Sequence, residues 1–127
     1  MSSERLRLRV FVVDDEPVIA STLEMILNHQ GFEAHSFNFP LEALSAAREE
    51  APDLLISDVV MPELSGIELA TQIRELCPNC KMLLFSGGAV TAKLLETARA
   101  SGHHFELISK PVHPADLLKK IRVVMQA

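Results

Sequence analysis

Short apolar segments alternate with amphipathic segments along the whole chain. Four segments are almost continuously apolar and have the length of buried strands: 8–13, 54–57, 81–85 and 105–108. A fifth segment, 32–37, is less apolar and is typical of a strand at the edge of a sheet. Strands that are apolar at nearly every position are buried on both faces, so the pattern predicts a parallel sheet with helices on both sides.

Between these segments, apolar residues recur with the spacing of an α-helix. Gly31 and Gly102 are positioned to end two of the five expected helices. Ser65 and Glu68 have the spacing of a capping box, and Pro114 suits the first turn of the last helix. The expected core-facing positions on the successive helices are Ile19, Leu23, Ile26 and Leu27; Leu41, Leu44 and Ala47; Ile67, Ala70, Ile73 and Leu76; Val90, Leu94, Leu95 and Ala98; and Leu117, Leu118, Ile121, Val124 and Met125. Strand and helix therefore alternate five times, which predicts an α/β domain of five strand–helix units.

The composition and charge fit one globular domain and exclude several classes of protein. The 127 residues are 48% hydrophobic and 23% charged, unlike a disordered or disulfide-stapled chain. The net charge of −5 argues against direct binding to nucleic acid, and the apolar runs are too short to span a membrane. With two cysteines and no secretory signal, the chain is expected in the cytoplasm.

Chemically reactive side chains follow four of the five predicted strands. They are Asp14 and Asp15 after the first strand, Asp58 after the third, Ser86 after the fourth and Lys110 after the fifth. Ligands of such sheets bind outside the carboxyl ends of the strands, so we expect these side chains to share one crevice. Three carboxylates repel one another unless a cation is present, and a site with few oxygen ligands favours Mg²⁺. The set suits phosphoryl transfer to a carboxylate, with the metal and Lys110 neutralising charge and Ser86 bonding to the transferred group.

These residues, together with Met61-Pro62, Gly66, Ser86-Gly87 and Lys110-Pro111, resemble the receiver domain of bacterial two-component response regulators. The resemblance covers residues 7–125 and leaves 1–6 as an N-terminal tail. It implies a flavodoxin-like, doubly wound (βα)5 fold whose five-stranded parallel sheet has the order 2-1-3-4-5. Because the chain ends with the fifth helix, a stand-alone receiver without an output domain is expected.

The resemblance also implies a role for each acidic residue. Asp58 would accept a phosphoryl group from a phosphohistidine on a sensor histidine kinase or a phosphotransfer protein. Asp15 and Asp58 would bind Mg²⁺ directly, together with the backbone carbonyl of Val60, and Asp14 would act through a water molecule. The protein would be a phospho-acceptor switch that catalyses only its own phosphorylation and dephosphorylation.

In receivers, a few neighbouring residues transmit the phosphorylated state. Ser86 and Lys110 would contact the phosphoryl group and Gly87 would give the following loop its freedom. Pro111 would follow Lys110 through a bond that is often cis. The output surface would be the fourth helix, fifth strand and fifth helix, which would bind a downstream protein effector. Phosphorylation would shift the population of an active state, and a phosphorylation-dependent dimer is compatible with this scheme.

Two features depart from the family pattern. Receivers usually carry Tyr or Phe three residues before the lysine, but this chain has Leu107 there, and Phe105 is the candidate to replace the missing ring. Val60 and Gly88 occupy positions that often tune hydrolysis of the aspartyl phosphate, and neither has a side chain that can position a water molecule. We therefore expect a fairly long-lived phosphorylated state.

Other interpretations compete with this one. The chain could be a receiver excised from a longer DNA-binding regulator or hybrid kinase, or a degenerate receiver that binds partners without phosphorylation. Cys77 and Cys80 have the spacing of a dithiol oxidoreductase, but they are expected at the end of a helix, whereas a reactive thiol needs a helix start. On the first helix, a second stripe of residues either docks the kinase or packs partly under the rim of the crevice. The stripe consists of Val18, Thr22, Met25 and His29.

Overall fold

Five parallel strands form the centre of the structure, in the order β2-β1-β3-β4-β5. The computed structural model describes residues 7–86, 89–102, 105–110 and 112–126. The strands are β1 (Arg9–Val13), β2 (Glu33–Phe37), β3 (Leu54–Asp58), β4 (Lys81–Ser86) and β5 (Glu106–Ser109). The helices are α1 (Pro17–His29), α2 (Pro40–Glu49), α3 (Gly66–Leu76), α4 (Ala89–Ala100) and α5 (Pro114–Gln126). None of the helices in these ranges is long and apolar enough to cross a lipid bilayer. The element order and strand order confirm the predicted doubly wound fold.

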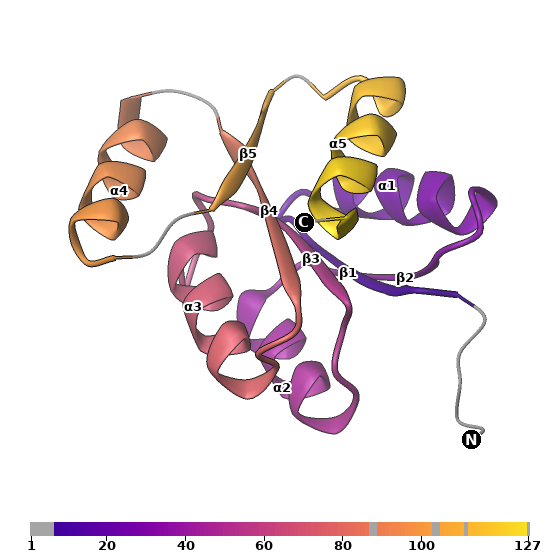
Figure 1. Cartoon of the computed structure of the whole chain (residues 1–127), viewed down its shortest axis with the longest axis horizontal. Helices are drawn as coiled ribbons and strands as arrows, with labels where there is room; N and C mark the ends of the chain where they lie inside the picture. The colour runs from indigo at the N-terminus through magenta and orange to yellow at the C-terminus, as the bar shows by residue number, and fades with distance from the viewer. Residues whose placement is uncertain (1–6, 87–88, 103–104, 111, 127) are drawn as a thin grey trace.

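The sheet is covered by helices on both faces. α1 and α5 lie on one face, and α2, α3 and α4 lie on the other (Figure 1). Along β1, Val10 and Val12 pack toward α1 and α5, whereas Phe11 and Val13 pack toward the opposite layer. Successive side chains of a strand point to opposite faces, so a strand covered on both sides must be apolar at every position. This explains the continuous apolar runs of β1, β3 and β4. The expectation of a buried strand is wrong for β5, which lies at the other edge of the sheet and has no buried residue.

The helix ends follow from the residues predicted to form them. The Ser65 side chain accepts a hydrogen bond from the N–H of Glu68, and the Glu68 side chain accepts one from the N–H of Ser65, so the capping box of α3 is confirmed. Gly31 and Gly102 follow α1 and α4 with φ of +96° and +88°, a conformation that glycine adopts without strain. α5 begins at Pro114, as predicted.

The predicted helix stripes are wrong at several positions. Leu41 and Leu76 are expected in the core, but they are 52% and 46% exposed. Each lies in a terminal turn, where the helix provides neighbours on one side only. On α1 the small residue Ala20 is fully buried, whereas Ile26 is half-buried. The side chain of Val90, also expected in the core, lies outside the described part of the chain.

The strand β2 lies at the edge of the sheet, as its weaker apolar pattern predicts. Asn28 of α1 covers part of its outer edge with its side-chain amide. The amide donates to the carbonyl of Ala34 at 3.2 Å and accepts from the N–H of Ala34 at 2.8 Å. A covered edge is less open to pairing with another chain.

Candidate functional site

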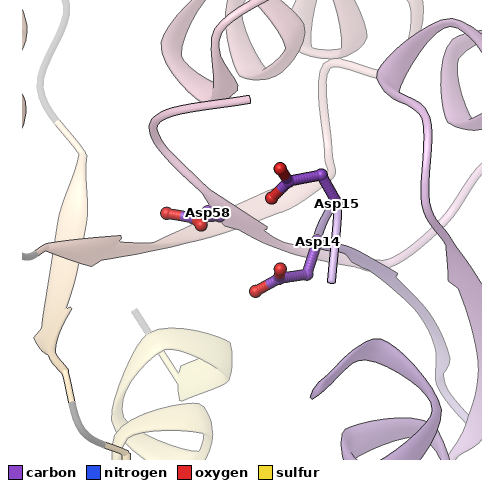
Figure 2. Close-up of side chains that lie close together, drawn as sticks. All are labelled: Asp14, Asp15 and Asp58. Carbon is purple, nitrogen blue, oxygen red and sulfur yellow. The ribbon is translucent and has the colours of Figure 1, made fainter. Parts of the chain in front are cut away.

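Three carboxylates gather where β1 and β3 end (Figure 2). Asp14 and Asp15 directly follow β1, and Asp58 is the last residue of β3, the neighbouring strand. One carboxylate oxygen from each residue lies within 4.8 Å of those of the other two, and the side chains are turned toward a common space. The strand order reverses at β1, which has β2 on one side and β3 on the other. The cluster therefore occupies the usual ligand position of an open α/β sheet.

Asp14 is buried and is held through both its backbone and its side chain. Its N–H donates to the carbonyl of Phe37 at 3.1 Å, and its own carbonyl accepts from Nδ2 of Asn38 at 3.1 Å. Its Oδ1 accepts from the N–H of Glu16 at 2.9 Å. Its Oδ2 is also buried but has no hydrogen-bond partner among the described residues. A buried carboxylate oxygen without a partner is unfavourable, so this atom favours a nearby cation.

The charges around Asp14 show why the cluster fits a metal ion. Burial raises the pKa of Asp14, and the carboxylates of Asp58 and Asp15 raise it further. The N–H of Glu16 and the ammonium of Lys110 act in the opposite direction and lower this pKa. A divalent cation would relieve the repulsion among the three carboxylates, and a donor set made only of oxygens suits a hard ion. The acidic cluster can therefore hold a metal ion.

Lys110 completes the crevice from the end of β5. Its Nζ donates to Oδ2 of Asp58 at 2.8 Å and lies 3.9 Å from Oδ2 of Asp14. Burial alone would lower the pKa of Lys110, but the hydrogen bond and charge of Asp58, together with the charge of Asp14, outweigh it and raise the pKa. The ammonium group therefore stays charged beside Asp58, where it can stabilise added negative charge.

The loop from β3 to α3 packs directly against the backbone of Asp58. A Cβ atom on Gly66 would overlap the carbonyl oxygen of Asp58, so this close approach requires glycine. The N–H of Gly66 also donates to the carbonyl of Val59 at 2.8 Å. Val60, two residues beyond Asp58, is 49% exposed. The glycine that contributes to the family resemblance thus has a steric role next to the central carboxylate.

The predicted switch residues lie at the carboxyl ends of β4 and β5. Ser86 is the last residue of β4 and pairs in register with Ser109, which directly precedes Lys110. The side chain of Ser86, and the residues Gly87 and Pro111, lie outside the part of the chain that the structure describes. The register of β4 and β5 places the carboxyl ends of both strands at the end of the sheet where the acidic cluster lies.

Leu107 and Phe105 occupy different places along β5. Leu107 pairs in register with Leu84, whereas Phe105 precedes the strand. Both side chains are half-buried against the core on the α3 and α4 side of the sheet. The ring centroid of Phe105 lies 4.8 Å from the guanidinium carbon of Arg74, on α3. Phe105 therefore contacts α3 at the end of β5 opposite to Lys110.

The two cysteines lie away from the crevice, between α3 and β4. Both thiols are free and buried, and the carbonyl of Cys77 accepts from the N–H of Cys80 at 3.0 Å. Burial raises the pKa of both thiols, to about 12 for Cys80. Thiol redox chemistry needs an accessible thiolate, so this environment argues against a dithiol oxidoreductase.

A groove of 560 Å³ runs beside α1 and reaches Lys110. Its lining includes Ile19 and Ile26, which are half-buried. Val18, also in the lining, and Met25 are 76% and 65% exposed. The second stripe on α1 therefore lies at the surface, and the alternative that it packs under the rim is wrong for these two side chains.

Asn38 is a site contact that the sequence analysis missed. It occupies the register position opposite Asp14, one residue beyond the last pair of β1 and β2. The register could have identified the pair, but an asparagine between a strand and a helix reads first as a turn residue.

The chain is similar in sequence to proteins of a known family. Residues 10–122 match the family model of the response regulator receiver domain. The transcriptional regulatory protein CreB of Escherichia coli is 32% identical over 123 residues, covering 94% of this chain and 52% of CreB. The response regulator receiver protein CpdR of Brucella abortus is 30% identical over 119 residues, covering 94% of this chain and 98% of CpdR. The chain thus spans about half the length of CreB and nearly the whole of CpdR.

A solved structure gives the same result at the level of the fold. The CheY-like response regulator receiver domain protein from Methanospirillum hungatei JF-1 has a TM-score of 0.84 and 28% sequence identity, with 94% of each chain covered. A family match over most of the chain, together with a shared fold, leads to one conclusion. The chain belongs to the family of response regulator receiver domains of two-component systems.

Proposed function

We propose that the protein is a phospho-acceptor switch and that Asp58 is the residue phosphorylated. The observation that carries this proposal is the 2.8 Å ion pair between Lys110 and Asp58 inside a cluster of two further carboxylates. Asp14 and Asp15 repel the carboxylate of Asp58, and a purely structural ion pair with Lys110 does not require this repulsion. The Asp58 side chain is 14% exposed, so a phosphodonor can reach it.

In the proposed reaction, a carboxylate oxygen of Asp58 attacks the phosphorus atom of a phosphohistidine. The new O–P bond forms as the N–P bond breaks, and the imidazole nitrogen takes up a proton from solvent. Lys110 would stabilise the charge on the phosphoryl oxygens. Hydrolysis then returns the carboxylate and inorganic phosphate, so the protein acts on no separate substrate. Val60 offers no side-chain group to position the attacking water, and we expect a fairly long-lived phosphorylated state.

The metal proposed for the acidic cluster is Mg²⁺, which neutralises charge on the phosphoryl oxygens when it is bound. Asp15, Asp58 and the backbone carbonyl of Val60 would hold it directly, and Asp14 would act through water. The exposed position of Asp15 and the buried Oδ2 of Asp14, which accepts no hydrogen bond from the described residues, support this assignment.

After transfer, Ser86 and Lys110 would contact the phosphoryl oxygens. Lys110 would exchange its bond to the Asp58 carboxylate for bonds to the phosphoryl group, which carries more negative charge. The change would pass along β5, through Leu107 and Phe105, to a surface formed by α4, β5 and α5. A downstream protein effector, or a second phosphorylated copy, would bind this surface.

The proposed phosphodonor protein is a sensor histidine kinase or phosphotransfer protein that docks beside α1. Val18 and Met25 expose apolar surface there, and the groove next to them reaches Lys110. The net charge of −5 does not favour nucleic acid as a direct partner. The proposed compartment is the cytoplasm, where free thiols such as Cys77 and Cys80 stay reduced.

The proposed receiver unit spans residues 7–125. Because the chain covers 52% of CreB and 98% of CpdR, a longer regulator with an output domain is the alternative to a stand-alone receiver. The two are distinguished by whether the reading frame continues beyond Ala127.

The proposal is tested by the intact mass of the protein after incubation with acetyl phosphate and Mg²⁺. We expect one added phosphoryl group on the wild-type chain, and none on Asp58→Asn or in the presence of EDTA. Asp116→Asn is the matched control, because it removes an exposed carboxylate at the start of α5, outside the cluster. It should be phosphorylated like the wild type. Equal phosphorylation of Asp58→Asn would contradict the proposal.

A further inference from the structure

The hydrogen-bond ladder between β1 and β2 continues one residue beyond the strands, and a side chain completes it. The last pair in register is Val13 and Phe37, so the next pair is Asp14 and Asn38. The N–H of Asp14 donates to the carbonyl of Phe37 at 3.1 Å. The carbonyl of Asp14 accepts from Nδ2 of Asn38 at 3.1 Å, a role that a backbone N–H takes in a continuing parallel ladder.

This contact fixes the peptide unit that joins Asp14 and Asp15, the residues that carry two of the three carboxylates. The carbonyl of Asp14 lies in the same plane as the N–H of Asp15, so holding it sets the direction of the chain at both residues. Asp14 is buried, with Oδ1 bonded to the N–H of Glu16, and Asp15 is exposed. The exposed carboxylate therefore depends on the backbone for its direction more than the buried one does.

We propose that Asn38 is a positioning residue for the metal site: its amide holds the Asp14–Asp15 peptide so that both carboxylates face Asp58. The inference rests on the proposed function, in which this cluster binds Mg²⁺. Asparagine suits the task because its amide donates without adding a charge that would compete with the cation. Asn38 does not cap α2, whose N-cap residue is Phe39. Its amide is turned to β1 instead.

The chain offers a matched control in Asn28. Like Asn38, Asn28 uses its side-chain amide to hydrogen-bond a backbone, in this case that of Ala34 in β2, with contacts of 2.8 and 3.2 Å. Ala34 pairs with Val10, near the opposite end of the strand from Asn38. Asn38→Ala removes one side-chain bond to the backbone, that to Asp14, whereas Asn28→Ala removes two, both of them to Ala34.

The test is the Mg²⁺ dissociation constant of the wild type, Asn38→Ala and Asn28→Ala, measured from amide chemical shifts in a two-dimensional NMR titration. NMR is suitable because the chain has no Trp or Tyr to report on the site by fluorescence. We expect Asn38→Ala to bind Mg²⁺ about three- to tenfold more weakly, the effect of losing one hydrogen bond. Asn28→Ala should stay within about twofold of the wild type.

A second variant distinguishes the loss of the hydrogen bond from a change in charge, and it provides the test if Asn38→Ala does not fold. Asn38→Asp keeps the shape but replaces the donor with a carboxylate, whose charge alone would tighten Mg²⁺ binding. The proposal predicts weaker binding in spite of that charge.

Several results would overturn the inference. One is a wild-type dissociation constant in Asn38→Ala, another is tighter binding in Asn38→Asp, and a third is an equal loss in Asn28→Ala. If the wild-type chain itself shows no Mg²⁺-dependent shifts, the metal site of the proposed function fails and this role of Asn38 fails with it. A failure confined to the Asn38 variants leaves the proposed function intact.

Discussion

The pKa values of individual side chains in the crevice depend on a balance between burial and neighbouring charge. Burial raises the pKa of Asp14, whereas Lys110 and the N–H of Glu16 favour its carboxylate form. For Lys110 the balance favours the charged form, because Asp58 lies 2.8 Å from its Nζ. The charge state of each group therefore depends on the positions of the others. A shift of the Asp58 backbone would disturb Asp14, Lys110 and Asp58 together.

Gly66→Ala should produce such a shift. The added Cβ would overlap the carbonyl oxygen of Asp58, so the loop or the strand end must move. We expect a loss of about 1–3 kcal/mol in the free energy of unfolding, typical of overpacking. We also expect a marked fall in the rate of phosphorylation by acetyl phosphate.

Ser65→Ala separates the two effects of the Gly66 substitution. It removes the N-cap of α3, at a cost of about 1 kcal/mol, without pushing on Asp58. Its phosphorylation rate should stay close to that of the wild type. Phosphorylation of Gly66→Ala at the wild-type rate would show that the close contact does not position Asp58.

At the level of elements, the edge strand β2 is joined to β1 by polar contacts as well as by the backbone ladder. Oε2 of Glu33 lies 2.9 Å from Nε of Arg9, in β1, and 3.0 Å from Nε2 of His35, which lies in β2 itself. The hydrogen bonds from His35 and Arg9 lower the pKa of Glu33 from 4.5 to about 2. Glu33 is 28% exposed, so solvent screens these ion pairs and their contribution is modest.

This contact predicts a pH dependence of stability with a definite sign. A carboxylate whose pKa is lowered on folding stabilises the protein above its unfolded pKa and loses that effect as the pH falls through the folded pKa. The stability difference between the wild type and Glu33→Gln should therefore be constant near neutral pH and shrink from about pH 5 toward pH 2. Urea unfolding of both proteins across this range measures it. A difference that stays constant or grows on acidification would be inconsistent with the lowered pKa.

The elements were predictable because burial leaves a direct trace in the sequence. The apolar runs of β1, β3 and β4 follow from coverage on both faces, and the capping box of α3 and the proline that begins α5 are local signals. The exposure of Leu41 and Leu76 was not predictable, because a helical stripe does not record how the final turns are covered. The bond from Asn38 to Asp14 was missed because it joins two loops distant in sequence, and composition says nothing about where an amide points.

In the whole molecule, the crevice lies at the carboxyl ends of the strands, between the two helical layers that cover the sheet. α1, α5 and the groove that reaches Lys110 lie on one side, and α3 and α4 lie on the other (Figure 1). A phosphoryl group on Asp58 would stand beside residues that follow β1, β3 and β5. Charge added at one atom can thus act on both layers, which suits a switch that shifts a population between two states.

The central claim, that Asp58 is the phosphoacceptor, is tested most directly by locating the phosphoryl group after reaction with acetyl phosphate and Mg²⁺. One sample is treated with hydroxylamine, which cleaves acyl phosphates but leaves phosphoesters intact, and another is digested and sequenced by mass spectrometry. We expect hydroxylamine to remove the phosphoryl group and the modified position to be Asp58. A hydroxylamine-resistant group, or an acyl phosphate on a different carboxylate in a chain with Asp58 intact, would contradict the claim.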